Sequence, residues 1–367
     1  MSASIVRVEL GERSYEVAIG PGLLASAGPR LHDAGARRAV VVADSGVLGT
    51  HAVAVADSLR HAGLAVTTIP VERGEASKSV AEAERIWESL AAAAVDRGTH
   101  LVAVGGGVVG DLAGFAAATF ARGLPVWQVP TTLVAQVDSS IGGKTGVNLR
   151  GGKNLVGAFW QPRGVIADTD TLATLPAREY ASGLAEVVKY GVIRDAELFA
   201  RLEGAAGRVV ARDPREIGVI VGRCVAIKAE VVSADEHERS GARATLNYGH
   251  TFGHAYENAL GYGTLLHGEA VAIGMADAAE LAVRLGRVPA ALARRQDRLL
   301  EALGLPTRLP AGVSLAADAL LALMARDKKA LDGRLRFVLP SRLGHVELVD
   351  GVPAQMVREV LARPATA

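Results

Sequence analysis

The first half of this chain alternates short apolar runs with segments in which apolar residues recur at helical spacing. This alternation constrains the fold more than any other feature, because strands that alternate with helices assemble into a mostly parallel sheet. The pattern predicts an α/β sheet that helices cover on both faces. The expected elements are an opening hairpin of Ile5–Leu10 with Tyr15–Ile19, the strands Ala39–Ala43, Val66–Ile69, Leu101–Val104, Val126–Val129 and Val165–Ala167, and the helix Ser79–Ala94.

After Leu175 the pattern changes to long helical segments, with one further strand signal at Leu335–Leu339. A chain of 367 residues exceeds one ordinary core and suits two domains. We therefore predict an α/β domain over residues 1–175 and an α-helical domain over residues 176–367. The expected helices of the second domain are Ala177–Arg194, Arg215–Val232, Tyr248–Ala259, Gly268–Leu285 and Ala290–Leu303.

Composition argues against several classes of protein. Lys and Arg number 40 against 39 Asp and Glu, and no basic run of nucleic-acid type occurs, so we expect no nucleic-acid partner. No apolar stretch approaches the length of a membrane span, and the N-terminus lacks the shape of a signal peptide, so we expect no membrane association. The one cysteine, Cys224, lies in an apolar run and is expected to be a buried packing residue. These features favour a cytoplasmic location.

A glycine-rich turn follows the expected strand Leu101–Val104. Gly105, Gly106, Gly107 and Gly110 satisfy the pattern G-x-G-x-x-G and open the helical run Asp111–Ala121. In that context glycines let the backbone approach a pyrophosphate, and a helix N-terminus supplies amide donors. The motif indicates dinucleotide binding, with an ordinary structural turn as the alternative.

Asp44 ends an earlier expected strand, where its carboxylate could accept hydrogen bonds from ribose hydroxyls. It precedes the glycines, whereas the usual fingerprint places the acidic residue after them, so we expect a variant of the Rossmann domain. The alternative role for Asp44 is a helix N-cap. Gly143-Lys144-Thr145 is similar to the end of a P-loop, but Asp138 occupies the position of the required earlier glycine, which excludes nucleoside triphosphate hydrolysis.

Histidines cluster in the second half. His250 and His254 are four residues apart, Glu257 continues the same helix face, and His267 precedes another helix start. This pattern indicates metal binding or acid–base chemistry, with structural polar residues at helix ends as the alternative. Spacing leaves open which histidine is a ligand and which is a base. Glu186 lies in an apolar helical segment, where a carboxylate is costly unless it is a ligand or is paired, for example with Lys189.

The stretch from Arg122 to Asn154 is rich in glycine, polar and cationic residues and is only weakly periodic. We expect a long functional loop there, because long loops inside compact domains commonly carry binding residues. Lysines and an asparagine on such a loop suit phosphate capture, and solvated surface lysines are the alternative. Further cationic residues that could bind an anionic group follow at Lys228, Arg243 and Lys328-Lys329.

Several motifs, taken together and in order, are similar to those of the 3-dehydroquinate synthase family of sugar-phosphate cyclases. The resemblance extends over nearly the whole chain and implies a Rossmann-like NAD-binding domain followed by an α-helical domain that holds Zn²⁺ or Co²⁺. The motifs are Gly74-Glu75-Ala76-Ser77-Lys78, Gly105 to Asp111, Pro130-Thr131-Thr132-Leu133, Asp138 to Asn154, Thr174 to Glu179, Ala185 to Gly191, Asn247 to His254, His267-Gly268-Glu269 and Asp327-Lys328-Lys329.

The resemblance also implies roles for individual residues. Glu186, His250 and His267 would hold the metal, which leaves His254 as an acid–base and orienting group. Contacts to NAD would come from the glycine turn and from Asp44, Glu75, Lys78, Gly106, Asp111, Thr131, Thr132, Lys144, Lys153, Thr174 and Glu179. Contacts to the substrate would come from Asp138, Lys144, Asn154, Lys189, Lys228, Arg243, Asn247 and Lys328, with Arg122 reaching across the interface of an expected homodimer.

The implied enzyme is an NAD- and metal-dependent carbon–oxygen lyase of the shikimate pathway, which leads to chorismate and the aromatic amino acids. Its substrate would be 3-deoxy-D-arabino-heptulosonate 7-phosphate, and its products 3-dehydroquinate and phosphate. The steps are transient oxidation, β-elimination with the leaving phosphate as base, reduction, ring opening and an intramolecular aldol. The alternatives are a related cyclase of secondary metabolism, a metal-dependent polyol dehydrogenase and a non-catalytic NAD- or metal-sensing protein.

Overall fold

The computed structural model describes residues 3–261, 263–326 and 335–362, which divide into two compact units. The first unit is Met1–Leu175 with Ile217–His237, and the second is Pro176–Glu216 with Glu238–Ala367. Ile217–His237 thus groups with the first unit, although it lies within the range 176–367 of the sequence-based division. Its side chains explain this, because Ser233 accepts a hydrogen bond from the backbone of Glu9 and Lys228 contacts Asp138.

The first unit is built on a seven-stranded sheet in the order β1-β2-β9-β6-β5-β3-β4. β1 and β2 form an antiparallel hairpin, and every other neighbouring pair in this sheet is parallel. The predicted parallel sheet and opening hairpin are therefore confirmed. The strands are β1 (Ser4–Val8), β2 (Tyr15–Gly20), β3 (Arg38–Asp44), β4 (Ala65–Val71), β5 (Thr99–Gly105), β6 (Val126–Pro130) and β9 (Gly164–Asp168).

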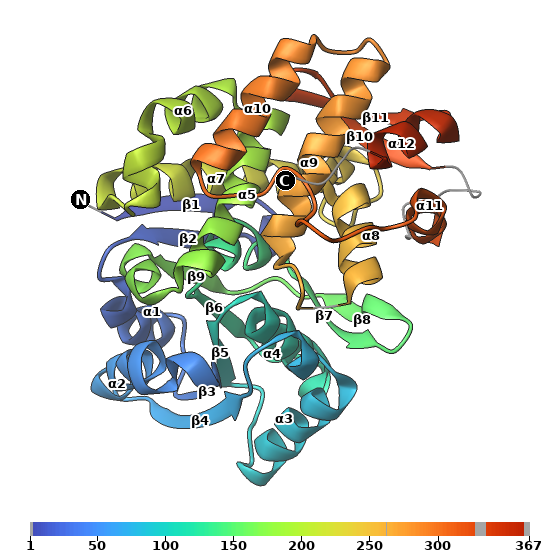
Figure 1. Cartoon of the computed structure of the whole chain (residues 1–367). Helices are drawn as coiled ribbons and strands as arrows, with labels where there is room; N and C mark the ends of the chain where they lie inside the picture. Colours follow the sequence, from blue (N-terminus) through green and yellow to red (C-terminus); the bar gives the residue numbers. More distant parts are fainter. Residues whose placement is uncertain (1–2, 262, 327–334, 363–367) are drawn as a thin grey trace. The chain divides into compact units, whose positions relative to one another are not determined.

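Helices cover both faces of this sheet, as the near-continuous apolar strands require. Alternate residues of β3 enter different cores, with Val40 and Val42 on one face and Val41 on the other. The first core includes residues of α3 (Val80–Ala92) and α4 (Gly107–Thr119), and the second includes residues of α1 (Ala27–Asp33) and α2 (Val53–His61). Figure 1 shows α1 and α2 on one side of the sheet and α3 and α4 on the other.

The strand order reverses between β3 and β5. From β3 the chain first runs outward to β4 and then returns to place β5 on the other side of β3. In open α/β sheets, ligands bind beyond the carboxyl ends of the strands at such a switch point. Asp44 and Gly105 end these two strands and lie so close that a Cβ on Gly105 would be 3.0 Å from Cβ of Asp44. The fold thus brings two residues of the predicted dinucleotide site together.

The stretch from Arg122 to Asn154 is not a long loop, and that expectation was wrong. After β6 it contains a π-helical turn, η7 (Ala135–Ser139), and the antiparallel hairpin of β7 (Lys144–Leu149) and β8 (Gly152–Phe159). Glycines in the hairpin serve close contact between strands, since a Cβ on Gly157 would lie 2.1 Å from the carbonyl oxygen of Thr145. Glycine content, which suggested a loop, here reflects crowding within a sheet.

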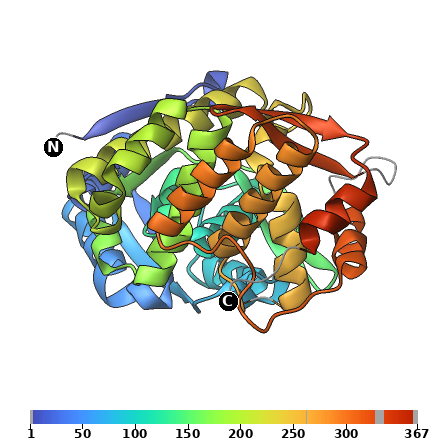
Figure 2. The ribbon, with the colours of Figure 1, turned by 45° about the horizontal axis from the view of Figure 1, so that its top comes forward.

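The second unit is mostly helical, as predicted. Its central helix α9 packs against α5, α8 and α10, and Figure 1 and Figure 2 both show α9 beside α10. A small sheet of β10 (Arg336–Arg342) and β11 (His345–Asp350) completes it, of which the sequence predicted only the first strand. The helices are α5 (Ala177–Ile193), α6 (Ala196–Val210), α8 (His250–Leu260), α9 (His267–Arg284), α10 (Ala290–Ala302), α11 (Ala317–Arg326) and α12 (Ala354–Leu361), while α7 (Pro214–Ala234) begins in this unit and continues in the first.

Within the described ranges, no helix combines the length and the apolar character that crossing a bilayer requires.

Glycines let three helices of the second unit approach one another closely. A Cβ on Gly274 of α9 would lie 2.1 Å from the carbonyl oxygen of Gly249, directly before α8. A Cβ on Gly268 would lie 1.8 Å from the carbonyl oxygen of Ser182 on α5, and the Gly268 amide donates to the Ser182 hydroxyl at 3.0 Å. No side chain could be added at these positions without moving a backbone. The glycine contacts therefore fix the spacing of α5, α8 and α9.

A buried carboxyl group on α9 should make the stability of the protein depend on pH. Asp277 accepts a hydrogen bond of 2.5 Å from the Tyr256 hydroxyl, and burial raises the pKa of Asp277 to about 7. Between about pH 4 and 7 the unfolded chain has lost this proton while the native state keeps it, so the free energy of unfolding falls as pH rises. Asp277→Asn should remove this decline. The melting temperature of the variant, measured relative to that of the wild type at the same pH, should therefore rise as pH increases from 4 to 8. The exposed Asp318→Asn is the control, and an equal offset at every pH would contradict the prediction.

Candidate active site

The glycine turn of the first unit is lined by residues of neighbouring segments. The amide of Thr131 donates to the carbonyl oxygen of Gly105 at 2.9 Å, which joins the ends of β5 and β6. A Cβ on Gly106 would lie 3.1 Å from Cγ2 of Thr132, and one on Gly107 would lie 2.9 Å from the Ser139 hydroxyl. Larger residues would fill this space. The N-terminus of α4 begins at the same turn, so its amides and dipole suit an anion such as a pyrophosphate.

Asp44 acts as a cap in this structure. Its Oδ1 accepts a hydrogen bond of 2.7 Å from the amide of Gly46, at the start of the short helix η3 (Ser45–Val47). This is the alternative role that the sequence left open. Because Asp44 also ends β3 at the switch point, contact with a ribose stays a prediction rather than an observation.

Other residues expected to contact NAD meet near α4. Lys78, whose side chain is buried, forms an ion pair with Asp111 in the first half of α4. Thr174 lies elsewhere in the unit, where its hydroxyl is 2.8 Å from Nε2 of His51. Burial lowers the pKa of His51, and nothing in its local sequence predicted that it would lie beside Thr174. Glu179 lies on α5 and belongs to the second unit.

Two residues expected to contact the substrate, Lys228 and Asp138, form a hydrogen-bonded ion pair with each other. Nζ of Lys228 lies 2.6 Å from both Oδ1 and the backbone oxygen of Asp138. Lys228 is 5% exposed and reaches η7 from α7. A buried ammonium needs such partners, so this pair holds both side chains in fixed positions. Lys144 begins β7, while Lys153 and Asn154 lie in β8, so the hairpin carries three of the expected residues.

Arg122 is exposed at the end of a strained turn. It has φ +66°, after Ala121 at φ +49°, and both are left-handed conformations that side chains rarely adopt. The following Gly123 packs against Trp160, whose ring a Cβ on Gly123 would meet at 2.5 Å. Strain of this kind persists where the surroundings enforce it and is concentrated at functional sites.

Three side chains of the second unit form a set that could hold a metal ion. One ligand atom from each of Glu186, His250 and His267 lies within 4.8 Å of the others. Oε1 of Glu186 is 3.6 Å from Nε2 of His250 and 3.4 Å from Nε2 of His267. A tetrahedral zinc with bonds of about 2.1 Å separates its ligands by about 3.4 Å. Two imidazoles and one carboxylate therefore fit zinc in both chemistry and spacing, and they would leave a fourth position open.

The remaining atoms of these ligands have partners of their own. Nδ1 of His250 lies 3.1 Å from the carbonyl oxygen of Tyr248, and Nδ1 of His267 lies 3.5 Å from Oε2 of Glu257. Each ring thus turns Nε2 toward Glu186, as expected when a partner fixes the tautomer of a liganding histidine. Oε2 of Glu186 forms an ion pair with the buried Lys189, which is the alternative partner that the sequence suggested. Burial lowers the pKa of His267, but hydrogen bonds to Glu186 and Glu257 outweigh it and raise this pKa to about 10.

His254 lies beside this set but outside it. Its ring centroid is 5.4 Å from that of His250 and 6.3 Å from that of His267. It follows His250 by one turn of α8, so it stands next to the metal position without joining the three clustered ligand atoms. A histidine in this place can orient or protonate a group that occupies the open position.

Two further residues expected to contact the substrate, Arg243 and Asn247, lie in the second unit. Arg243, which is 2% exposed, and Asn247 lie on one helical turn, η9 (Ala242–Asn247), directly before the segment that leads to His250. Nε of Arg243 is 3.7 Å from Oε1 of Glu238. Lys328, for which a substrate contact was expected, lies outside the described residues, as does its neighbour Lys329.

Glu257 should affect metal affinity although it is not one of the three ligands. We expect Glu257→Gln to weaken zinc binding about 10- to 100-fold, because the charged partner of His267 is lost. The measurement is competition for zinc with a chelator of known affinity. Glu216→Gln alters another buried carboxylate of the same unit, one that binds Arg201 and Arg208, and should leave zinc affinity unchanged. Equal zinc affinities for wild type and Glu257→Gln would contradict the prediction.

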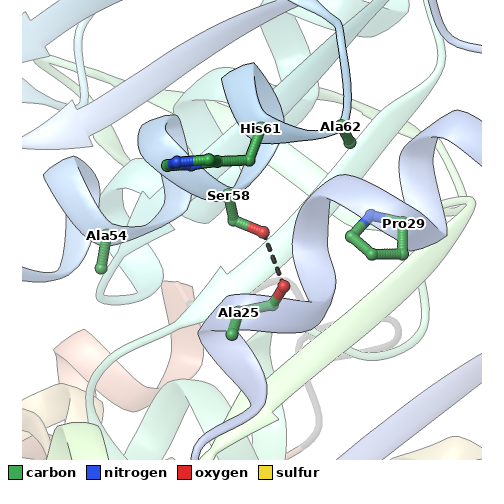
Figure 3. A pocket seen from close by; sticks show the side chains of 6 residues that line it. All are labelled: Ala25, Pro29, Ala54, Ser58, His61 and Ala62. Atoms are coloured by element: carbon green, nitrogen blue, oxygen red, sulfur yellow. Dashed lines mark hydrogen bonds between the residues drawn. The ribbon is translucent and has the colours of Figure 1, made fainter.

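A hollow of about 390 Å³ lies between α1 and α2 and is lined by none of the residues expected at the site. Figure 3 shows that the Ser58 hydroxyl points to the backbone oxygen of Ala25, with Pro29, Ala54, His61 and Ala62 around it. The same hydroxyl accepts a hydrogen bond from the amide of Gly28. These contacts serve packing between two helices, so we do not include the hollow in the candidate site.

Comparison with known proteins gives consistent results. A family model described as 3-dehydroquinate synthase N-terminal matches residues 68–182, and one described as 3-dehydroquinate synthase C-terminal matches residues 183–330. A 3-dehydroquinate synthase of Rhodopirellula baltica is 49% identical over 360 residues, which cover 96% of this chain and 95% of that protein.

Solved structures of two cyclases are also similar. A 2-deoxy-scyllo-inosose synthase, in complex with carbaglucose-6-phosphate, NAD⁺ and Co²⁺, has a TM-score of 0.88 at 29% identity over 98% of this chain and 99% of the other. A 2-epi-5-epi-valiolone synthase from Streptomyces hygroscopicus, with NAD⁺ and Zn²⁺ bound, has a TM-score of 0.87 at 32% identity over 96% of this chain and 97% of the other.

Proposed function

Because the chain belongs to the 3-dehydroquinate synthase family, we propose that it converts 3-deoxy-D-arabino-heptulosonate 7-phosphate to 3-dehydroquinate and phosphate. The observation that carries this proposal is the relationship to a curated synthase over nearly the whole of both chains. The enzyme is an NAD- and metal-dependent lyase that forms a carbocycle in the shikimate pathway. The residues described above are proposed to supply what each step of that reaction requires.

The first unit is proposed to bind NAD, which would accept a hydride from the substrate and later return it. The glycine turn and the N-terminus of α4 would hold the pyrophosphate. Asp44, Glu75 and Lys78, together with Asp111, would position the rest of the cofactor. The supporting observations are that Asp44 ends β3 at the switch point and that Lys78 forms an ion pair with Asp111 of α4, the helix that follows β5.

The second unit is proposed to hold the metal through Glu186, His250 and His267. A bound divalent ion supplies Lewis acidity, which acidifies a hydroxyl and polarises the carbonyl formed beside it. His254 would orient the substrate and move a proton at that hydroxyl, because its ring lies within a turn of helix from His250. Zinc and cobalt both suit this donor set.

Phosphate elimination needs cations that hold the leaving group, and the leaving phosphate would itself serve as the base. Lys144, Asn154 and Lys328 are proposed to bind it, with Lys153 near both substrate and cofactor. The position of Lys144, Lys153 and Asn154 in one hairpin supports this assignment. Ammonium and amide donors form strong hydrogen bonds to phosphate oxygens.

The substrate carboxylate is proposed to bind Arg243, Asn247 and Lys228, with Asp138 and Lys189 positioning neighbouring groups. Arg243 offers a planar fork that suits a carboxylate, and its side chain is buried. These residues favour the heptulosonate phosphate over the substrates of the secondary-metabolic cyclases, which lack that carboxylate.

The decisive experiment is incubation with the heptulosonate phosphate and a catalytic amount of NAD. We expect phosphate and 3-dehydroquinate to form in equal amounts while NADH does not accumulate. A cyclase of secondary metabolism would release phosphate only from another sugar phosphate. A polyol dehydrogenase would accumulate NADH with a simple polyol. A sensing protein would release no phosphate from any sugar phosphate.

The active form is proposed to be a cytoplasmic homodimer in which Arg122 serves the partner's site. Arg122→Ala and Glu186→Ala should each be inactive alone, but a mixture that exchanges subunits should regain activity. In a mixed dimer, one site has an intact Glu186 from one chain and an intact Arg122 from the other, so about a quarter of all sites recover. The measurement is phosphate release after mixing. No recovery, with exchange verified by a tag on one variant, would place Arg122 in its own chain's site.

A further inference from the structure

A bulge in β8 carries two of the residues expected at the site. In the hairpin, Val147 pairs with Val156, and two residues further on Leu149 pairs with Gly152. Asn148 therefore faces three residues of the opposite strand, among them Lys153 and Asn154, where a regular ladder would place one. Such irregularities re-aim side chains and need contacts that hold them in place. Asn154 has φ +54°, a left-handed conformation.

Asn148 makes hydrogen bonds in two directions. Its Oδ1 accepts from the amide of Asn154 at 2.9 Å, which gives the bulged backbone a side-chain partner. Its Nδ2 donates to Oε1 of Glu75 at 2.7 Å, and its own amide donates to the carbonyl oxygen of Lys78 at 2.8 Å. Asn148 thus joins the bulge to both ends of the turn Glu75–Lys78, on which two of the expected NAD contacts lie.

We propose that Asn148 is a positioning residue that couples cofactor binding to the binding of the substrate's phosphate group. The inference rests on the proposed function, in which Glu75 and Lys78 contact NAD while Lys153 and Asn154 contact the substrate. NAD that orders the turn Glu75–Lys78 fixes the side chain of Asn148, and its Oδ1 then fixes the bulge. The coupling is reciprocal, so a bound phosphate also favours NAD.

The first test is Asn148→Ala, which removes both side-chain hydrogen bonds. A hydrogen bond to a charged group contributes substantially to binding free energy. We therefore expect the Kd of NAD and the KM of the heptulosonate phosphate each to rise about tenfold. Calorimetric titration with inorganic phosphate, with and without saturating NAD, measures the coupling directly. The wild type should bind phosphate more tightly when NAD is present, and Asn148→Ala should bind it equally in both cases. Leu149→Ala is the matched control, because Leu149 is a neighbour on the same hairpin and is 45% exposed.

A second variant separates the hydrogen bond to the Asn154 amide from the one to Glu75. It also keeps the proposal testable if Asn148→Ala misfolds the hairpin. Asn148→Asp keeps an acceptor for the Asn154 amide but places a negative charge beside Glu75, so the Kd of NAD should rise. In a Glu75→Gln background the new glutamine amide can donate to the introduced carboxylate, and Asn148→Asp should then cost less than it does in the wild type. Equal costs in both backgrounds would overturn the proposal, as would wild-type coupling in Asn148→Ala or the same losses in Leu149→Ala.

These results stand apart from the proposed function. If the wild type releases no phosphate from the heptulosonate phosphate, the assigned reaction fails, while the titrations with NAD and inorganic phosphate still report on coupling. If the wild type is active and Asn148→Ala keeps its coupling, the inference about Asn148 fails alone.

Discussion

Replacing Glu186 by glutamine should yield a folded protein that holds no catalytic metal and releases no phosphate from the heptulosonate phosphate. Oε1 of Glu186 is the atom that approaches both His250 and His267, so its charge is central to the proposed ligand set. We expect zinc content to fall to background and turnover to fall by about 10³-fold or more, because the Lewis acid contributes several kcal/mol to the reaction. Zinc content by elemental analysis and phosphate release measure the two effects.

The control for this prediction concerns Lys189. The variant leaves a buried ammonium beside a neutral amide, and breaking a buried pair can cost about 3–5 kcal/mol of stability. Zinc must therefore be measured on protein whose circular dichroism is that of the wild type, at a temperature well below its melting transition. Folded Glu186→Gln that retained one zinc per chain would remove Glu186 from the ligand set.

Replacing His254 by alanine should lower activity sharply and leave the metal in place. Its ring neighbours those of His250 and His267, yet the three clustered ligand atoms belong to other residues. A group that orients substrate and moves a proton contributes about 10²- to 10⁴-fold, so turnover should fall within that range while zinc content stays at one per chain. His345→Ala, in a strand of the same unit with a side chain 48% exposed, is the control. Zinc-free His254→Ala would show that His254 is a ligand.

Taken together, the two variants separate holding the metal from using it. Glu186→Gln should lose both zinc and activity, and His254→Ala should lose activity alone. The absorption spectrum of cobalt-substituted protein adds a test that does not depend on turnover, since a tetrahedral site with a changed ligand gives a changed spectrum.

Much of the first unit could be predicted because its strands have a strong local signal. Val40, Val41 and Val42 lie in a short apolar run, and successive residues of a strand point to opposite faces of the sheet. Such a run is buried only if both faces are covered, and β3 contributes to a core on each face. The hairpin of β7 and β8 could not be predicted in this way. Its strands have exposed apolar residues such as Leu149 and Leu155 and glycines that serve strand contact, so periodicity and composition both pointed to a loop.

The candidate site could be predicted only in part, because local spacing relates residues within one helix but not between helices. Spacing along one helix relates His250 to His254, but it carries no information about Glu186 or His267, which come from other helices. Only the resemblance to a family selected the set of three. Asn148 was missed because a single asparagine leaves no pattern, and its role arises from a bulge that depends on how two strands pair.

The glycine contacts between the helices carry a lesson for transplanting this chemistry. Copying Glu186, His250 and His267 onto three helices of another protein would not reproduce their geometry, because ordinary side chains at Gly249, Gly268 and Gly274 would push the helices apart. A designer would have to transfer these three glycines together with the three ligands. Glycines outside the proposed ligand set would therefore determine its geometry together with the ligands themselves.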